Sequence, residues 1–472
     1  MPSVQLKLTT TTAHGMVFRS WSKDNTATTD LGITCGSCVF YGATVGRDAS
    51  YVQKLRKAGV IILGKSNLSE WGNIRSTNPG NFRKSNSSNG WSAVGGQTLG
   101  VYYPNQDPIG SSSGSGVATA LGLAFAAIGI EVGGSIIGPA QRSNIIGIKP
   151  TVGLTSRDLV FISKRQGTVG PMARTLEDAA SLLEIIGGKC PHDPETSKIP
   201  FEHIPKYARF CNKSALKGAR IGIPRNAFRD NDEAAADEID LAGIAKAASI
   251  MKDAGAEIID PADYPEYETF LNESGALRGR VGFADWKADM ARYVTNLVDN
   301  PQNINNIDDL VEFTQAHPKE EYPSRDVAGL LGVSKAMAQD VPRVEEAWER
   351  VRELAVRGGI NGAMKKHNLD ALIMPSSVST SVATVALAPV ITVPLGFYPE
   401  NTGIVWNGRR NLVLQDKNLP FGLSFIGLPF TETKLIGYAY AFEQLTKVRD
   451  QVDPIVMPKT ELRDVAGKDS GI

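Results

Sequence analysis

Cysteine, net charge and long apolar runs are scarce in this sequence, and each shortage excludes a class of protein. Four cysteines in 472 residues are too few for a disulfide framework. The first residues, MPSVQLKLTTTTAHG, lack the apolar core of a secretory signal, so we expect a reducing, cytoplasmic location. Lys plus Arg and Asp plus Glu both number 50, and this balance indicates no nucleic-acid partner and no attraction to anionic lipid.

No run of the sequence is long and apolar enough to predict a membrane span. The longest uncharged stretch, between Asp107 and Glu131, opens with glycine and serine and has about 14 consecutive small or apolar residues from Val117. A membrane-spanning helix needs about 20. With 42% apolar and 21% charged residues, the composition is that of a globular protein, and a small molecule is the expected partner.

Helix and strand signals alternate along the first part of the chain. The run DASYVQKLRKAG predicts a helix that begins on the capping residue Asp48 and ends at Gly59, and VIIL then predicts a strand. SGSGVATALGLA leads into FAAIGIEV in the same order. Thr175 and Asp178 form a capping-box pattern ahead of another helix.

The rest of the chain predicts a helical flank followed by a return to strands. RIGIP is a short strand signal, and an Ala-rich helix is expected from about Asp232 to Ala254. Residues 263–357 are charged and favour helices, and 370–446 contain strand patterns with a final helix. Strands in the first and last thirds, joined by helices, predict one mixed α/β sheet and a single domain over residues 1–472.

Two motif matches point to other enzyme classes, and their context argues against both. GVIILGKS, from Gly59 to Ser66, fits the phosphate-loop pattern, but four consecutive apolar residues favour a straight buried strand over a loop that wraps phosphate. GSSSG places Ser112 in the nucleophile position of a G-x-S-x-G elbow. The segment before it, YYPNQDPI, is polar and broken by proline, whereas an elbow follows an apolar strand.

The pair Cys35 and Cys38 in CGSC could be half of a zinc site or a redox pair. A second pair is missing, because Cys190 and Cys211 lie 21 positions apart. We therefore expect buried free thiols and no metal.

The segment from Pro108 to Gly138 carries serine and glycine at both ends of a predicted helix and strand. Glycine beside serine allows the backbone to approach a substrate and frees N–H groups to stabilise an oxyanion. In EVGGS the candidate amides are those of Val132, Gly133 and Gly134. The competing interpretation is that these residues only form turns.

The order of these motifs resembles the signature block of the amidase signature family. GSSSGSG, GGS, NIIGIKPTVGLTSRD and GTVGPMARTLEDAA follow one another over about 108–180, and KDN, TCGS, APVITVPLGF and PFGLSFIG extend the resemblance over most of the chain. The resemblance implies the amidase signature fold, a single large mixed sheet with helices on both faces. It also implies a cofactor-independent enzyme that hydrolyses carboxamides.

The resemblance also implies the roles of three residues. The nucleophile ends the GGS motif at Ser135, and the serine held by a cis peptide bond is Ser111, 24 residues earlier. The lysine of the K-D-N motif is Lys23, whereas Lys65 in GKSN is expected to be structural. Neutral Lys23 would draw a proton through Ser111 from Ser135, and the amides of 132–134 would hold the oxyanion.

The chain departs from the family around Lys23. The family's strand has the form H-G-x-P-x-x-x-K-D-N after a helical segment, but HGMVFRSWSKDN lacks the proline and places Lys23 nine positions after His14. A truncated N-terminus and a partly lost strand are both open interpretations. Ile109 stands for the second glycine before the serines, and Ile137 stands for a frequent arginine two positions after the nucleophile.

Three functional hypotheses follow. The first is an amidase acting on linear amides, as a monomer or a homodimer. The second is the amidotransferase subunit that releases ammonia from glutamine for tRNA-bound glutamate, which predicts stable partner subunits. The third is a degenerate amide-binding protein, which the altered strand before Lys23 favours.

Overall fold

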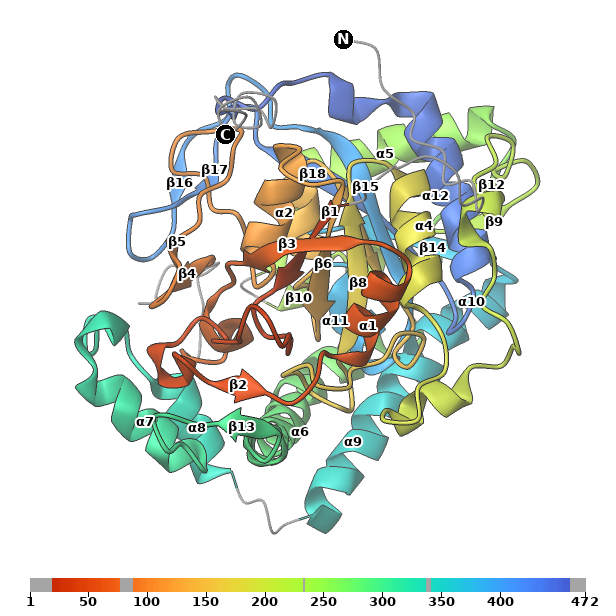
Figure 1. Ribbon diagram of the computed structural model, residues 1–472. Helices are drawn as coiled ribbons and strands as arrows, with labels where there is room; N and C mark the ends of the chain where they lie inside the picture. The colour runs from red at the N-terminus through yellow and green to blue at the C-terminus, as the bar shows by residue number, and fades with distance from the viewer. Residues whose placement is uncertain (1–18, 77–87, 232–233, 337–340, 459–472) are drawn as a thin grey trace.

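The computed structural model describes residues 19–76, 88–231, 234–336 and 341–458. Its centre is one ten-stranded mixed sheet (Figure 1), with the strand order β12-β9-β14-β18-β15-β7-β8-β6-β1-β3. The strands are β1 (Arg19–Lys23), β3 (Ile61–Ser66), β6 (Ala126–Glu131), β7 (Ile146–Lys149), β8 (Thr168–Ala173), β9 (Arg220–Gly222), β12 (Glu257–Ile259), β14 (Ala371–Pro375), β15 (Val390–Phe397) and β18 (Pro420–Ile426). The expected mixed α/β sheet, built from the first and last thirds of the chain, is confirmed.

The strand directions bring two distant parts of the chain to one edge of the sheet. β1 lies between β3 and β6 and runs parallel to both, with Ser22 opposite Ile128. Parallel neighbours end at the same edge of a sheet. The last residue of β1, Lys23, therefore lies beside the end of β6, where the GGS segment begins.

Helices pack around the sheet in two groups, as expected. One group, formed by α2 (Ser113–Ala120) and α3 (Ile137–Arg142), packs against β6, β7, β15 and β18. A second group consists of α1 (Ser50–Lys57), α4 (Leu176–Ile186) and α12 (Glu432–Thr446), whose members contact one another and strands β3, β7, β8, β15 and β18. Gly147 allows α3 to approach β7, because a Cβ there would lie 2.6 Å from Ala140 Cβ.

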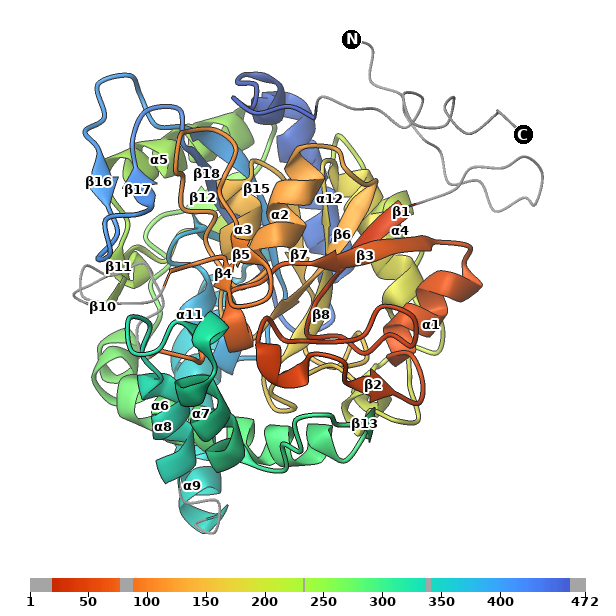
Figure 2. The same cartoon turned by 60° about the vertical axis from the view of Figure 1, so that its left-hand side comes forward.

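The expected helical flank lies below the sheet in Figures 1 and 2. Its helices are α6 (Tyr267–Val294), α7 (Ile307–Ala316), α8 (Ala328–Lys335) and α9 (Val341–Ala355), and α10 (Asn361–His367) follows just beyond the expected bounds. The remaining longer helices are α5 (Glu238–Asp253), which packs on β14, and α11 (Thr380–Val385), which contacts α9. Four two-stranded ribbons complete the fold: β2 (Thr44–Val45) with β13 (Leu297–Asp299), β4 (Trp91–Ser92) with β5 (Gly96–Gln97), β10 (Arg229–Asn231) with β11 (Ala234–Ala235), and β16 (Val405–Trp406) with β17 (Val413–Gln415).

Two helix starts differ from the prediction. The N-cap of α1 is Ala49, which makes no side-chain cap bond, and Asp48 instead accepts a hydrogen bond from the Thr29 N–H. The Ala-rich helix was expected from about Asp232, but α5 begins at Glu238, where Asp237 caps the N–H groups of Ile239 and Asp240. Just before α5 the chain forms the β10–β11 ribbon, so its backbone groups there pair between strands and not within a helix.

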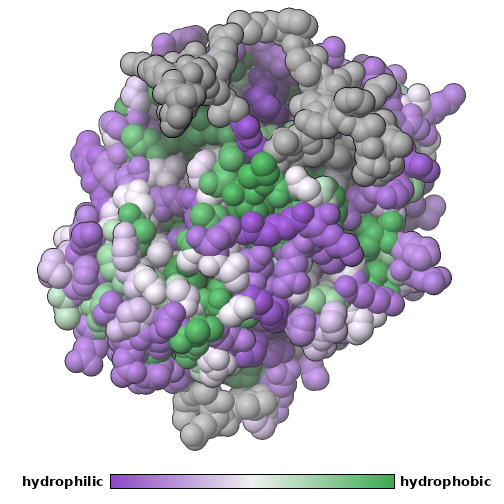
Figure 3. All heavy atoms as spheres, viewed as in Figure 1, coloured by the Kyte–Doolittle hydropathy of each residue, from purple (hydrophilic) through white to green (hydrophobic). Residues whose placement is uncertain are grey.

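Two other local predictions are confirmed. Thr175 caps α4 by accepting a hydrogen bond from the Asp178 N–H. The phosphate-loop match at 59–66 forms a strand, β3, and not a loop, with Lys65 inside it. The expected burial of this strand is wrong for one of its faces, because β3 is the edge strand of the sheet and its residues Ile61 and Leu63 are among the exposed large apolar residues. Figure 3 shows apolar side chains gathered on this face near the place of α2 and β3 in Figure 1.

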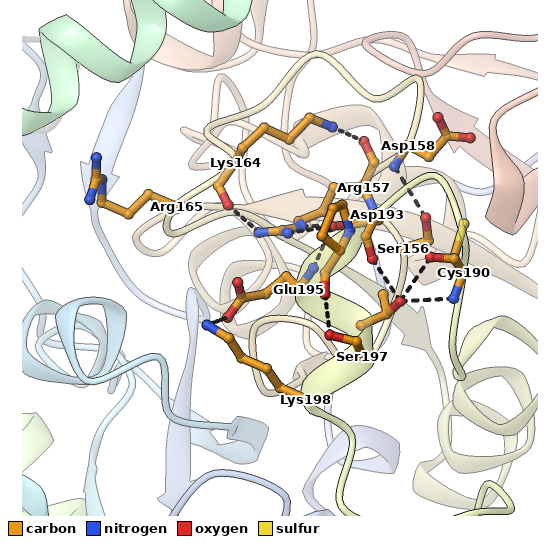
Figure 4. A network of polar contacts seen from close by, with 12 residues as sticks. Ser156, Arg157, Asp158, Lys164, Arg165, Cys190, Asp193, Glu195, Ser197 and Lys198 are labelled. Atoms are coloured by element: carbon orange, nitrogen blue, oxygen red, sulfur yellow. Dashed lines mark hydrogen bonds and ion pairs between the residues drawn. The ribbon is translucent and has the colours of Figure 1, made fainter.

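The loop that follows β7 is held by a buried ion pair (Figure 4). Arg157 donates from Nη2 to Asp193 Oδ1 at 2.6 Å and from Nε to Asp193 Oδ2 at 2.8 Å. Lys164 Nζ donates to the Arg157 carbonyl, and Arg157 Nη1 donates to the Lys164 carbonyl. Both partners of the ion pair are almost fully buried, and a buried pair holds its geometry best when its remaining donors are satisfied. The loop after β7 is thereby fixed to Asp193, which also caps the short helix η3 (Pro194–Lys198).

No helix in the described parts of the chain is long and apolar enough to cross a membrane.

Candidate active site

Lys23 is held at the end of β1 inside the molecule. Its side chain is 1% exposed, and Nζ donates to the Ile130 carbonyl at 3.1 Å. The polar side chain of Ser22 is buried and makes a hydrogen bond with the Tyr51 hydroxyl at 2.8 Å. Although its motif is altered, the described strand pairs with β3 through Lys23 and with β6 through Ser22. His14, which began the altered motif, lies outside the described residues.

The three residues named from the resemblance form a continuous hydrogen-bonded chain. Lys23 Nζ donates to Ser111 Oγ at 2.7 Å, and Ser111 Oγ donates to Ser135 Oγ at 3.0 Å. The peptide bond between Gly110 and Ser111 is cis. Lys23 comes from β1, Ser111 precedes α2, and Ser135 lies between β6 and α3. Three separate segments of the chain therefore converge on one hydrogen-bonded chain of side chains.

The environment of Lys23 favours a neutral amine. Burial lowers the pKa of Lys23 to about 7, and this effect exceeds the opposing influence of the Glu131 and Cys35 side chains. Desolvation disfavours the charged form of an amine. A lysine of this kind can accept a proton near neutral pH, which an exposed lysine does not do.

Glu131 holds the segment that carries Ser135, a role that the sequence reasoning missed. Its carboxylate accepts from the Gly134 N–H at 2.9 Å, from the Ile136 N–H at 2.5 Å and from the Ile137 N–H at 3.0 Å. The residue is fully buried. A charged residue at the end of the apolar run FAAIGIEV is the signal that could have revealed it, because buried carboxylates need hydrogen-bond partners.

The three candidate oxyanion amides differ in whether their N–H groups already donate a hydrogen bond. The Gly134 N–H already donates to Glu131. The N–H groups of Val132 and Gly133 donate to no acceptor within the described parts of the chain. Thr384 Oγ1 donates to the Val132 carbonyl at 3.0 Å, which fixes that peptide group. Val132 and Gly133 are the members of the expected set that can donate to a ligand without losing another bond.

A cavity of about 800 Å³ opens onto Ser135. It is lined by 72–74, 89, 109–110, 132–135, 138, 141–142, 166, residues of α6 from 275 to 283, 376–378, 380, 384 and 414. The signature block, the helical flank and the C-terminal third all contribute. Such a volume is typical of a small-molecule site.

Ile109, the residue that replaces a family glycine, lies in this wall in an unusual conformation. Its φ is +53°, in the left-handed region that β-branched residues rarely adopt. The N–H of Ile109 donates to Asp107 Oδ1 at 2.7 Å, and its carbonyl accepts from Ser113 Oγ at 2.6 Å. Its side chain also packs closely over Gly138, where a Cβ would lie 2.6 Å from Ile109 Cγ2. Ile109 thus has a backbone conformation that favours glycine while it carries a large side chain. Ile137, at the frequent arginine position, is fully buried.

The residues of the competing motifs lie outside this chain of hydrogen bonds. Lys65 Nζ donates to the Thr26 carbonyl and lies 3.8 Å from Asp24. Ser112 is fully buried and bonds to the backbone of Ile130. Cys35 and Cys38 are buried free thiols, as expected, and burial raises the pKa of Cys35 well above its usual value. Among the described residues, no cluster of His, Cys, Asp or Glu could hold a metal ion.

Comparison with known proteins places the chain in a family. The model of the Amidase family matches residues 15–436. A protein of Arthroderma benhamiae whose name describes it as an amidase is 43% identical over 448 residues, covering 94% of this chain and 73% of that protein. The native peptide amidase of Stenotrophomonas maltophilia has 33% identity and a TM-score of 0.78, covering 93% of this chain and 84% of that one. The A-type component of the glutamyl-tRNA(Gln) amidotransferase of Prochlorococcus marinus is more distant, with 29% identity over 90% of this chain and 83% of that protein.

The fold and the family match together define a hydrolase that acts on amides. This chain belongs to the amidase signature family, as the resemblance of its motifs implied.

Proposed function

We propose that this chain hydrolyses linear carboxamides through an acyl-enzyme on Ser135. The observation that carries the proposal is the unbroken path from Lys23 Nζ through Ser111 Oγ to Ser135 Oγ, with steps of 2.7 and 3.0 Å. Both steps are within the distance at which hydroxyl and amine groups exchange protons. The mouth of the cavity at Ser135 supplies room for an amide.

In the proposed first step, Lys23 acts as the base. Before the transfer the hydroxyl hydrogens turn, so that Ser135 Oγ donates to Ser111 Oγ and Ser111 Oγ donates to the neutral Lys23 Nζ. The amine then takes the Ser111 proton while Ser111 takes the Ser135 proton, and the transfer restores the donor direction of the structure. Ser135 Oγ attacks the amide carbon, and the Val132 and Gly133 N–H groups donate to the oxygen that becomes negative. Preorganised backbone donors stabilise such an oxyanion strongly. Glu131 holds the loop in position.

In the proposed second step, the protons return along the same path. The relay protonates the leaving nitrogen as the C–N bond breaks, which leaves an ester on Ser135 and releases an amine or ammonia. Water then attacks the ester carbon with the relay again acting as base, and a carboxylic acid leaves while Ser135 regains its proton. No redox partner is needed, because the reaction is a hydrolysis.

The direct test compares purified wild type with Ser135→Ala on simple aryl and aliphatic amides. We expect kcat to fall by at least about 10⁴-fold in Ser135→Ala, while Ser214→Ala, a change at an exposed serine, keeps wild-type activity. A fluorophosphonate probe should label the wild type and spare Ser135→Ala, since labelling requires an activated hydroxyl. Equal amide hydrolysis by wild type and Ser135→Ala would overturn the proposal.

The amidotransferase role is the second candidate, and the 29% identity to the A-type component of that complex is the observation that favours it. It requires partner subunits, whereas an amidase acts alone. Size-exclusion chromatography of the purified chain, combined with the amide assay, separates the two: a monomer or homodimer that hydrolyses amides supports the amidase. Activity that appears only with added partners supports the amidotransferase.

A further inference from the structure

The charge of the cavity is of one sign. Among the described residues that line it, the charged side chains are those of Arg142 and Arg278, and the rest are neutral. Arg142 ends α3, the helix that begins two residues after Ser135. Arg278 projects from α6 in the helical flank. Two separate elements therefore bring a guanidinium to the cavity that contains the nucleophile.

Arg142 has hydrogen-bonding capacity that the protein does not use. Its Nε and Nη1 atoms are shielded from solvent and have no hydrogen-bond partner within the described parts of the chain. A buried donor without a partner carries a desolvation cost. No described residue accepts a hydrogen bond from the Arg142 side chain, so its positive charge has no bonded counterpart in the wall of the cavity. Nη2 is not among the shielded atoms and is the donor that a ligand in the cavity can reach. A guanidinium that lacks a bonded acceptor in such a wall is the arrangement expected where an anionic ligand supplies the acceptor.

The carboxylates near Arg142 are occupied elsewhere. Asp107 accepts from the Asn89 amide at 3.1 Å and from the Ile109 N–H at 2.7 Å. Asp240 accepts from Ser377 Oγ at 2.8 Å. Burial raises the pKa of both carboxyl groups, the charge of Arg142 opposes this rise electrostatically, and neither group accepts a hydrogen bond from Arg142. Arg278 donates a hydrogen bond from Nη1 to Ser381 Oγ at 2.8 Å. Of the two cations that line the cavity, Arg142 is thus the one that lacks a bonded partner among the described residues.

Resting on the proposed amide hydrolysis, we propose that Arg142 binds an anionic group of the substrate, and that the natural substrate class is an amide bearing a carboxylate. From Ile137 to Arg142 the helix rises roughly 8 Å, so the carboxylate would lie a few bonds from the amide carbon. Arg142 acts here as a specificity-determining residue and takes no part in the chemistry.

The test compares an acidic amide with a neutral one of the same shape. To place the carboxylate on the acyl side of the amide bond, the pair is adipic acid monoamide and the analogue in which a methyl ketone replaces its carboxylate. To place it on the amine side, the pair is N-acetyl-5-aminopentanoate and the corresponding methyl ketone. We expect wild type to favour the acid of one pair by about tenfold to hundredfold in kcat/KM, as a charge-assisted hydrogen bond allows. In Arg142→Met this ratio should fall to about one, and Arg142→Lys should keep part of it.

Arg209→Met is the matched control, because Arg209 is exposed on the short helix η4 (Tyr207–Phe210) away from the cavity lining, and it should keep the wild-type ratio. If Arg142→Met does not fold, Arg142→Gln takes its place. The pair that shows the preference tells which side of the amide bond faces Arg142. A ratio near one in wild type for both pairs, or a ratio unchanged by removing the guanidinium, overturns the inference.

A binding measurement keeps this result separate from the proposed hydrolysis. In the Ser135→Ala background, calorimetry with adipic acid monoamide and N-acetyl-5-aminopentanoate should show binding of one of them that weakens at least tenfold when Arg142→Met is added. If no amide is hydrolysed but this difference is found, the proposed hydrolysis fails and the anion site stands. If amides are hydrolysed and neither acid shows the difference, the anion site fails alone.

Discussion

At Lys23, the burial that lowers the pKa of the amine also sets the pH dependence expected of the proposed mechanism. The folded-state pKa is about 7, well below the ordinary value for lysine. Below that pH the amine is mostly protonated and cannot accept the Ser111 proton. Above it the amine is mostly neutral and can act as the base of the proposed mechanism. The direction of the pH dependence therefore follows from one desolvated side chain.

We predict that kcat/KM for a neutral amide rises about tenfold per pH unit below pH 7 and levels off above it. A pH–rate profile between pH 5.5 and 9 measures this. Lys23→Met should lower kcat by about 10²- to 10⁴-fold, which is the usual contribution of a general base. A profile that is flat across this range would contradict the assignment of Lys23.

Glu131 offers a second test at the residue scale, because its charge acts on Lys23 and its oxygens hold three N–H groups. We predict that Glu131→Ala lowers the free energy of unfolding by about 2–4 kcal/mol, since buried donors lose their acceptor, and lowers kcat by at least about tenfold. Glu131→Gln keeps one acceptor oxygen and should be milder. Because the carboxylate raises the Lys23 pKa, its removal should move the acid limb to lower pH. An unmoved limb in Glu131→Gln would argue against this coupling.

At the scale of elements, short-range signals decide where helices begin. Thr175 caps α4 through the Asp178 N–H, and Glu177 and Asp178 place negative charge in the first turn. Such caps satisfy backbone donors that have no partner inside the helix. Short-range signals do not by themselves decide the start of α5. The alanines just before it, Ala234 and Ala235, belong to a β-ribbon, and the helix begins only after Asp237.

For α4 we predict that Thr175→Ala lowers the free energy of unfolding by about 1 kcal/mol, measured by urea denaturation. Thr175→Ser, which keeps the hydroxyl, should lie within a few tenths of a kcal/mol of wild type. Amide hydrolysis should be the same in all three proteins, because α4 lies outside the lining of the cavity. If Thr175→Ser lowers the free energy of unfolding as much as Thr175→Ala does, the stabilisation comes from the threonine methyl group and not from the hydroxyl cap.

At the scale of the whole molecule, a buried cluster ties the helical flank to the first third of the chain. Arg75 Nη1 donates to both Glu70 Oε1 and Glu320 Oε2 at 2.7 Å, and Ser37 Oγ donates to Glu320 Oε1 at 2.7 Å. Burial, followed by the nearby Glu320 carboxylate, raises the pKa of Glu70 well above its usual range. The two glutamates and Arg75 are buried. We propose on this ground that sheet and flank form one domain.

We therefore predict that Glu320→Ala lowers the free energy of unfolding by about 3–5 kcal/mol, because it leaves a buried guanidinium short of a partner. Calorimetry should show one transition in wild type and one, at lower temperature, in the variant. Glu353→Ala removes a surface ion pair with Arg357 and should cost less than about 1 kcal/mol. A variant that loses only a separate, early transition would indicate that the flank is a domain of its own.

The sequence by itself determined the family, through the resemblance of its ordered motifs, and that resemblance also supplied the spacing of Ser111 and Ser135. It determined several helices and strands as well, because these depend on local hydrophobic periods and capping residues within one segment. It also pointed to Lys23 through the K-D-N motif. Only the tertiary structure decided that Lys23 reaches Ser111 across 88 positions, that Glu131 takes the Gly134 N–H away from the expected oxyanion set, and that Arg142 is left without a partner among the described residues. These contacts follow from the strand order and from which side chains are buried together, and no local pattern encodes either.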